Sequence, residues 1–336
     1  MVKKLATRGA FLFGGILILI ALMAGAALGW RALRRHQLSE AMVIDTPSGI
    51  DERQYVRIGG VEQWITIRGR NRDNQAILML HGGPGAANSV LPKLFLPWEH
   101  DFTVVQWDQR GAGKSYSANK RPPDIALMVR DAVEVSDYAR HRLRKNKITL
   151  LGHSWGSVPG VVAIKARPDL FDAWVGTRQI VSWPRNEVAA YAQVLTKARA
   201  RGDRESVDAL ERSGAPPYHQ IRQMGVERRV AIKYEPAVGF LPLLMGLLTA
   251  PDYSLQDMGH YVRGILDGDD FLGKRWTGHW RGWTCPPWEP ISPSPFTSSR
   301  GRKTIWRQPC SLGSISIGSR HLEKGSCWCR ARAMAL

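Results

Sequence analysis

The sequence LLGHSWGS, residues 150–157, places one serine between two glycines, directly after an apolar run. Residues 148–151 are short and apolar, which predicts a buried strand, and residues 155–165 have a helical pattern. The glycines of G-x-S-x-G allow a sharp turn between strand and helix that lifts the Ser154 hydroxyl above the edge of a sheet. An ordinary glycine turn is the alternative. The strand before the turn and the helix after it favour a nucleophilic serine.

Apolar runs and helical patterns alternate along the chain around this turn. Residues 76–80 and 102–107 are typical of strands buried on both faces of a parallel sheet. Residues 53–58 and 61–68 roughly alternate between apolar and polar side chains, which predicts an antiparallel hairpin. Residues 124–144 predict a long amphipathic helix. Strands that alternate with helices predict an α/β fold with a doubly wound, mostly parallel sheet.

Residues 186–272 differ from the predicted core, which covers residues 53–185. They are mostly helical in pattern, with breaks at residues 214–217 and at Pro251, and they predict a helical cap inserted between strands of the sheet. Within the cap, residues 241–250 are apolar but too short to span a membrane, so we expect them to pack inside it.

The N-terminal segment has the length and composition of a transmembrane helix. Residues 9–30 carry no charged side chain, and 22 residues suffice to cross a bilayer core of about 30 Å. A signal peptide cleaved near residues 24–26 is the alternative, but its apolar region is usually shorter. We therefore expect a single-pass anchor over residues 1–35 and a polar linker over residues 36–52. Basic residues balance on the two sides, so a domain outside the cytoplasm is only slightly preferred.

Much of the net charge of +18 lies in the C-terminal tail, residues 273–336. Eleven Lys or Arg residues and only two acids occur from Lys274 onward. The four cysteines of the chain also lie there, at Cys285, Cys310, Cys327 and Cys329. Their position excludes a disulfide scaffold for the main domain, and C-x-C alone is a weak metal signal, so no metal and no cofactor is expected. Scattered Trp and Arg residues resemble a nucleic-acid patch, but the tail has no recognisable binding module and no nucleic-acid partner is expected.

A second glycine-rich motif, HGGPG at residues 81–85, follows another predicted strand. A structural turn is the alternative, since Gly and Pro occur in any loop. The functional interpretation is one half of an oxyanion hole, with His81 and Gly82 supporting the loop. Gly83 would donate one backbone N–H to the substrate carbonyl, and Trp155 would donate the other.

A third motif, DQRGAGKS at residues 108–115, contains the Gly-Lys-Ser of a phosphate-binding loop. The glycine that such a loop needs five residues before Gly113 is replaced by Asp108, so nucleotide binding is rejected. We expect Asp108 and Arg110 to form a buried pair that holds this loop beside the oxyanion motif.

The three motifs HGGPG, WDQRGAGKS and GHSWGS, in this order and spacing, resemble the α/β-hydrolases of the proline iminopeptidase family. The resemblance covers residues 55–272. It implies a serine hydrolase that removes N-terminal proline from peptides through an acyl-enzyme on Ser154, with related members acting on other amides and esters. It also implies a cap whose acidic residues hold the free amine of the substrate. Glu187 is the candidate for that role, and a solvated glutamate at a helix start is the alternative.

The partners that Ser154 would need are not found in the sequence as written. In this fold a catalytic Asp and then a His follow the serine. The family's phrases for them, QG-x-(D/E)-D and G-x-GH, do not occur in this chain. A serine without a base is a poor nucleophile at neutral pH. The later histidines and aspartates, none in such a setting, are His260, His279, His321, Asp267, Asp269 and Asp270.

Both phrases become permitted when the tail is decoded in another frame. If each codon's third base is joined to the next two bases, residues 283–306 can encode a segment that contains QGAEDD, and residues 330–336 can encode GAGHGP. We therefore interpret the tail as the product of a frameshift between about residues 272 and 283, which replaces the C-terminal part of the core. Three functions stay open: an aminopeptidase, an esterase or lactone hydrolase with the same machinery, and a catalytically inactive truncated product.

Overall fold

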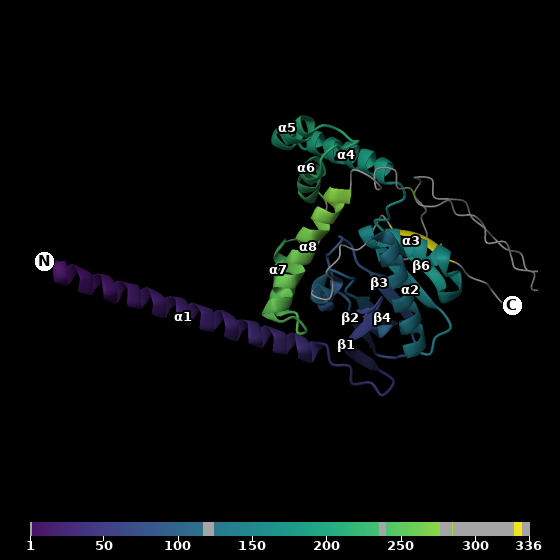
Figure 1. Cartoon of the computed structure of the whole chain (residues 1–336), viewed down its shortest axis with the longest axis horizontal. Helices are drawn as coiled ribbons and strands as arrows, with labels where there is room; N and C mark the ends of the chain where they lie inside the picture. Colours follow the sequence, from purple (N-terminus) through teal and green to yellow (C-terminus); the bar gives the residue numbers. More distant parts are fainter. Residues whose placement is uncertain (1, 117–123, 235–239, 276–283, 285–325, 331–336) are drawn as a thin grey trace, which may run out of the picture.

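The computed structural model has an α/β core, a helical cap and one long N-terminal helix (Figure 1). The sheet and its helices lie at one side of the molecule, and the N-terminal helix leaves from the other side. The structure describes residues 2–116, 124–234, 240–275, 284 and 326–330 of the chain.

The described residues form a seven-stranded sheet with the order β1-β2-β4-β3-β5-β6-β7. Strands β3 to β6 are parallel to one another, β1 and β2 form the predicted antiparallel hairpin, and β2 is antiparallel to β4. The expected doubly wound, mostly parallel sheet is therefore confirmed. The strands are β1 Ile50–Ile58, β2 Val61–Gly69, β3 Gln75–Leu80, β4 Phe102–Trp107, β5 Ile148–His153, β6 Phe171–Thr177 and β7 Ser326–Arg330.

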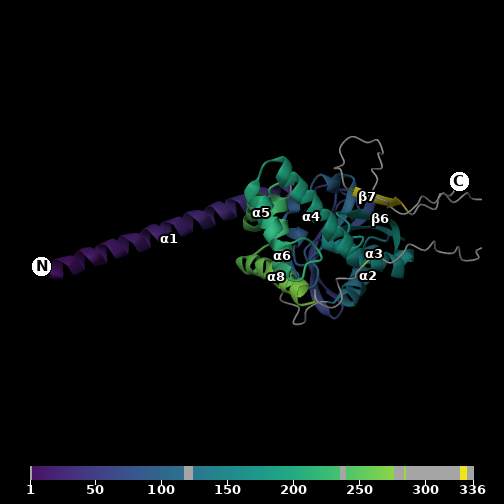
Figure 2. The same cartoon turned by 90° about the horizontal axis from the view of Figure 1, so that it is seen from above.

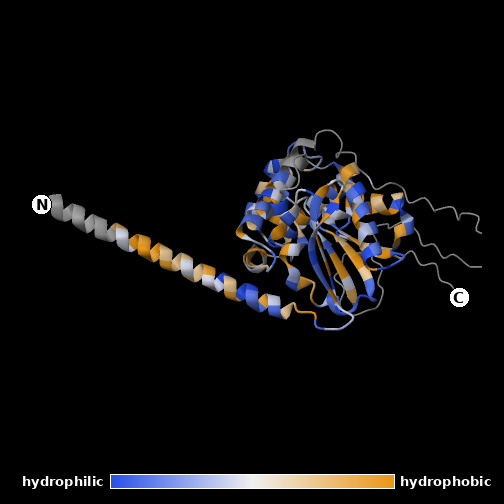
Figure 3. Cartoon of the chain, turned by 60° about the horizontal axis from the view of Figure 1, so that its bottom comes forward, coloured by the Kyte–Doolittle hydropathy of each residue, from blue (hydrophilic) through white to orange (hydrophobic). Residues whose placement is uncertain are grey.

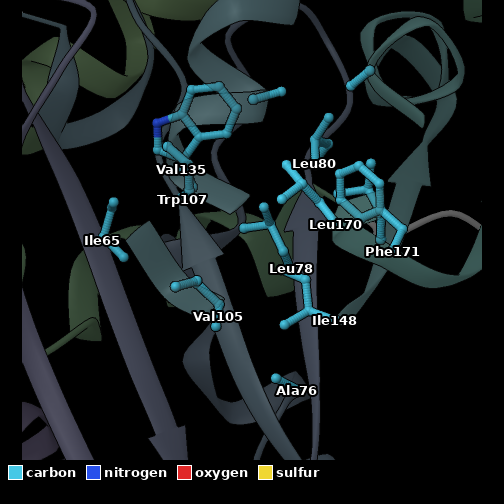
Figure 4. Close-up of a cluster of buried hydrophobic side chains, with 14 of the residues drawn as sticks. Ile65, Ala76, Leu78, Leu80, Val105, Trp107, Val135, Ile148, Leu170 and Phe171 are labelled. Carbon is cyan, nitrogen blue, oxygen red and sulfur yellow. The ribbon is translucent and has the colours of Figure 1, made fainter. Parts of the chain in front are cut away.

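The central strands are buried on both faces because the side chains of a strand alternate between them. On β3, Leu78 and Leu80 belong to the main hydrophobic cluster (Figure 4). Ile77 and Met79 belong to a second cluster, with Phe95. The main cluster also takes residues from helix α2, Ile125–Arg142, and helix α3, Ser157–Ala166. This two-sided burial explains the continuous apolar runs in the sequence.

The cap is helical, as predicted, and the predicted breaks at residues 214–217 and Pro251 fall between helices, whereas a further break at residues 201–203 was not predicted. Its helices are α4 Trp183–Ala200, α5 Arg204–Ser213, α6 Ile221–Ile232, α7 Phe240–Thr249 and α8 Leu255–Arg275. The expectation that residues 241–250 pack inside the cap is wrong for α7. Leu247 is buried beside Ala87 and Val90 of the core, whereas Leu241 on the other side of α7 is 65% exposed.

Helix α1, Val2–Ala41, continues through the first part of the expected linker. The most apolar 18-residue window within residues 13–41 has a mean hydropathy of 2.1, and none of it is buried by the protein. Helix α1 is therefore long and apolar enough to cross a membrane, and a signal sequence would have the same properties. The end of α1 is fixed to the body of the molecule. Arg31 donates a hydrogen bond to the carbonyl oxygen of Tyr253 at 2.8 Å, and Arg35 donates one to Pro251.

Candidate active site

Ser154 lies on a strained turn between β5 and the helix that follows. Its φ is +49°, a left-handed conformation that residues other than glycine seldom adopt. The two flanking glycines are required by space, because a Cβ on Gly156 would overlap the carbonyl oxygen of Leu80 and a Cβ on Gly152 would overlap the ring of Trp174. The strand, the turn and the helix therefore have the geometry of a nucleophile elbow.

The HGGPG motif lies directly against this elbow. A Cβ built on Gly82 would be 3.4 Å from the Cβ of Ser154 and 3.2 Å from Cδ2 of His153. Gly83 and Gly85 have φ values of +118° and +98°, which favour glycine. The structure thus brings together two motifs that lie about seventy residues apart in the sequence. The roles of Gly83 and Trp155 as oxyanion donors remain a prediction.

His81 connects the HGGPG loop to the loop that follows β4. The backbone N–H of Gln109 donates to Nε2 of His81 at 3.1 Å, and Nε2 of Gln109 donates to the His81 carbonyl oxygen at 3.0 Å. Since Nε2 of His81 accepts, the proton belongs on Nδ1, which lies 2.8 Å from the carbonyl oxygen of Gly82. Burial lowers the pKa of His81 to about 4, so the imidazole is neutral at pH 7. His81 is a positioning residue for the loop.

The expected pair of Asp108 and Arg110 does not form. Arg110 instead makes a bidentate ion pair with Asp131 of α2, with Nε to Oδ2 at 2.8 Å and Nη2 to Oδ1 at 3.0 Å. Asp108 accepts from the backbone N–H of Lys114 at 2.9 Å and from the hydroxyl of Tyr253 at 3.2 Å. The two side chains bind different elements because Arg110 contacts α2 and Asp108 contacts the residues leading into α8. Burial raises the pKa of Asp108 to about 6.

Glu187, near the start of α4, is buried in a cluster of charged side chains. It is 5% exposed, so the alternative of a solvated glutamate is wrong. Its Oε1 accepts from Nη2 of Arg228 at 2.6 Å, and Arg228 also pairs with Glu227. Within the described part of the chain, Oε2 of Glu187 is buried with no hydrogen-bond partner. Burial raises the pKa of Glu187.

One aromatic layer connects this carboxylate cluster to the elbow. Trp155 and Val158, just after Ser154, pack with Trp183 and Tyr218 of the cap. Trp183 begins the helix that carries Glu187. Burial, and then the charges of Glu227 and Glu187, raise the pKa of the Tyr218 phenol, which therefore lies close to both carboxylates. The sequence does not predict Glu227 as a site residue, because nothing in its arginine-rich helix indicates that this carboxylate is buried.

Within the described residues, Ser154 has no base. Its side chain makes no hydrogen bond there. His260, on α8, packs against the ring of Tyr116 at 5.3 Å, and Asp267 accepts from the hydroxyl of Tyr116 at 2.8 Å. His153 contacts Thr177 through Nδ1 at 2.8 Å. His279, His321 and the side chains of Asp269 and Asp270 lie outside the described residues.

The chain is similar to known serine aminopeptidases. The family model for serine aminopeptidases, S33, matches residues 72–202. A Bacillus subtilis (strain 168) protein named as the probable aminopeptidase YbaC is 30% identical over 216 residues, which are 62% of this chain and 68% of that protein. The chain belongs to the S33 serine aminopeptidase family of α/β-hydrolases.

Other relatives are less similar in sequence. The proline iminopeptidase of Lactobacillus delbrueckii subsp. lactis is 29% identical over 110 residues, 32% of this chain and 37% of the enzyme. The chain thus spans little more than a third of that relative's length. The crystal structure of proline iminopeptidase from Mycobacterium smegmatis is 18% identical, with a TM-score of 0.44, over 69% of this chain and 76% of the enzyme.

The residues matched by the S33 family model contain only part of the candidate site. Residues 72–202 include the HGGPG loop, the elbow and Glu187, whereas Glu227, Arg228 and helices α6 to α8 follow it. The residues matched by the family model therefore include the proposed nucleophile.

Proposed function

We propose that Ser154 is the nucleophile of an aminopeptidase that removes an N-terminal residue, proline or another, from peptides. The observation that carries this proposal is the positive φ of Ser154 directly beside the HGGPG loop. This geometry presents a hydroxyl to a substrate carbonyl whose oxygen meets backbone N–H groups. The names of the relatives supply the substrate class, since they are aminopeptidases and proline iminopeptidases.

The reaction would proceed in two steps. The Oγ atom of Ser154 attacks the carbonyl carbon of the N-terminal residue, and a base takes the hydroxyl proton. The N–H groups of Gly83 and Trp155 donate to the oxyanion, and the proton then passes to the leaving amine as the peptide bond breaks. Water attacks the resulting ester in the same way, which releases the amino acid and returns the proton to Ser154.

The Glu187 cluster would bind the free amine of the substrate. Two carboxylates share one guanidinium, so the cluster of Glu187, Glu227 and Arg228 has an excess of negative charge when both acids are ionised. A substrate ammonium would donate to Oε2 of Glu187 and give that buried oxygen its missing partner. Binding the amine here fixes the first residue of the peptide and explains why an aminopeptidase would bury this acid.

The base and its orienting acid would be encoded by the other frame of the tail. The permitted phrases QGAEDD and GAGHGP would supply an Asp and a His in the order that the fold requires. The domain limits follow: core 53–185, cap 186–272, and a tail at 273–336 in place of the last part of the core. The chain as written would then have little activity, because a serine hydroxyl without a base is a weak nucleophile.

For the N-terminus, we favour a single-pass anchor with residues 9–30 in the membrane and the hydrolase outside the cytoplasm. The length of the apolar segment supports an anchor over a cleaved signal peptide. The apolar surface of α1 between Phe13 and Leu28 is exposed to its surroundings rather than packed on the protein.

Hydrolysis assays distinguish the three candidate functions. Proline β-naphthylamide and p-nitrophenyl acetate are offered to the chain as written, to the chain with its tail restored in frame, and to Ser154→Ala of each. We expect no activity above the alanine variant for the chain as written, and Ser154-dependent hydrolysis of the proline amide after restoration. Hydrolysis of the ester alone would indicate an esterase. Resequencing the gene tests the frameshift separately, and an uninterrupted frame through Leu336 would exclude it.

A further inference from the structure

Four large apolar side chains on α7 and α8 are exposed, and the surface that carries them is here called the α7–α8 face. Its members are Leu241 on α7 and Leu255, Val262 and Leu266 on α8, which are 65%, 59%, 47% and 61% exposed. The three on α8 are seven and four residues apart, so they lie along one line of the helix. The stripe ends before Asp269 and Asp270 in the sequence.

The opposite sides of both helices pack on the core. Leu247 of α7 and Tyr261 of α8 are buried in one cluster with Ala87, Val90 and Ala112. Gly264 of α8 lies against the HGGPG loop, where its carbonyl oxygen would overlap a Cβ on Gly85. The α7–α8 face is therefore held rigidly, with its four apolar side chains pointing away from the core.

Helix α1 leaves the body beside this face. The two carbonyl groups that bind α1 belong to Pro251 and Tyr253, in the turn between α7 and α8. Their partners, Arg35 and Arg31, come directly after the uncharged segment that ends at Trp30. Figure 3 shows this apolar band on α1 followed by a polar end at the body.

The cap lies on the side of the body that faces the apolar segment of α1. In Figures 1 and 2, α5, α6 and α8 lie on the side of the body from which α1 leaves, and β6 and α3 lie on the other side. Helix α8 runs across the direction of α1 rather than along it (Figure 1). A membrane crossed by residues 9–30 would end near Trp30, and α7 and α8 would then lie along its surface.

We propose that the α7–α8 face lies on the surface of the same lipid bilayer that α1 crosses. The inference rests on α1 being the anchor of the proposed function and adds a second contact, made by the cap. The bilayer is the fitting occupant because α7 is apolar and uncharged, α8 exposes apolar side chains together with the charged Arg263 and Asp267, and the turn between the two helices binds the exit of a membrane span. The cap then lies next to the membrane surface.

The test uses the full chain in vesicles of phosphatidylcholine and phosphatidylglycerol. A small fluorescent amino acid replaces Leu241 or Leu266, and in the control it replaces Val181, which is 52% exposed and lies between β6 and α4. Lipids with a nitroxide near the headgroup serve as quenchers. We expect quenching at least twofold stronger at positions 241 and 266 than at position 181.

Flotation of the same vesicles separates the two levels of the proposal. A chain that fails to float with lipid overturns both the anchor and the α7–α8 face. A chain that floats but shows equal quenching at all three positions overturns only the proposal that the α7–α8 face lies on lipid. The same holds if a second copy of the chain, rather than lipid, covers the label at position 241. Val262→Glu with Leu266→Glu, both at exposed positions, should lower quenching at position 241 at least twofold while leaving the thermal unfolding temperature unchanged.

Discussion

The loops after β3, β4 and β5 and the described tail residues 326–330 are held by different kinds of contact. In the first region, glycines with positive φ, the His81–Gln109 contacts and the Arg110–Asp131 pair hold the elbow in place. In the second, the described tail residues add an antiparallel strand to β6, from Ala173 opposite Arg330 to Thr177 opposite Ser326. The turn at Ser154 is therefore fixed by contacts among its own neighbouring loops in the described part of the chain.

The largest loss of stability is expected from removing one member of the buried ion pair between Arg110 and Asp131. Asp131→Ala leaves the guanidinium of Arg110 buried without its carboxylate, and such a loss costs about 3–5 kcal/mol of the free energy of unfolding. Chemical denaturation of the detergent-solubilised chain measures it. Asp169→Ala removes an exposed ion pair with Arg167 and should leave the free energy of unfolding nearly unchanged. Equal effects of the two substitutions would contradict the account.

A second prediction concerns the buried acid that joins the β4 loop to Tyr253. The folded state raises the pKa of Asp108 from 3.8 to about 6, so it keeps the proton while the unfolded chain loses it. Below about pH 4 this difference in pKa stabilises the fold by about 3 kcal/mol, and this stabilisation is lost as the pH rises through about 6. Asp108→Asn does not titrate. The unfolding free energy of the variant, minus that of wild type, should therefore rise by about that amount between pH 4 and pH 7, and a flat difference would refute the shift.

A third prediction sharpens the steric argument for the elbow. Gly156→Ala forces a Cβ against the carbonyl oxygen of Leu80 and should destabilise the fold by about 1–3 kcal/mol. Gly259→Ala is the matched control, since no atom lies within 4 Å of its added Cβ in helix α8, and it should be neutral or stabilising by up to about 1 kcal/mol. Thermal unfolding compares the two variants, and an unchanged unfolding temperature for Gly156→Ala would show that the turn can accommodate a Cβ.

The smallest expected effect lies in substrate binding by the cap. In the frame-restored chain, Glu187→Gln removes a charged acceptor for the substrate amine and should raise KM for proline β-naphthylamide about tenfold, with kcat changed less. Because burial raises the pKa of Glu187, KM of the wild type should fall as the pH rises and the carboxylate forms. The ester p-nitrophenyl acetate has no amine, so its KM should not change. An unchanged KM for the proline amide would exclude Glu187 from amine binding.

The sequence sufficed for the features that depend on neighbouring residues. The apolar runs, the Gly59–Gly60 hairpin turn, the glycines around Ser154 and the predicted helical breaks of the cap all follow from local patterns. Long-range polar partners did not follow: Asp131 lies 21 residues beyond Arg110, and nothing in its helix marks it as the partner. The exposure of Leu241 also depends on where α1 and the core place α7.

The central claim is that Ser154 is a well-placed nucleophile whose base is encoded in the other frame of the tail. A fluorophosphonate probe, which reacts with activated serines, tests it most directly when the labelled peptide is identified by mass spectrometry. The account predicts labelling of Ser154 in the frame-restored chain and little labelling in the chain as written. Equal labelling of the chain as written, or none after restoration, would contradict it.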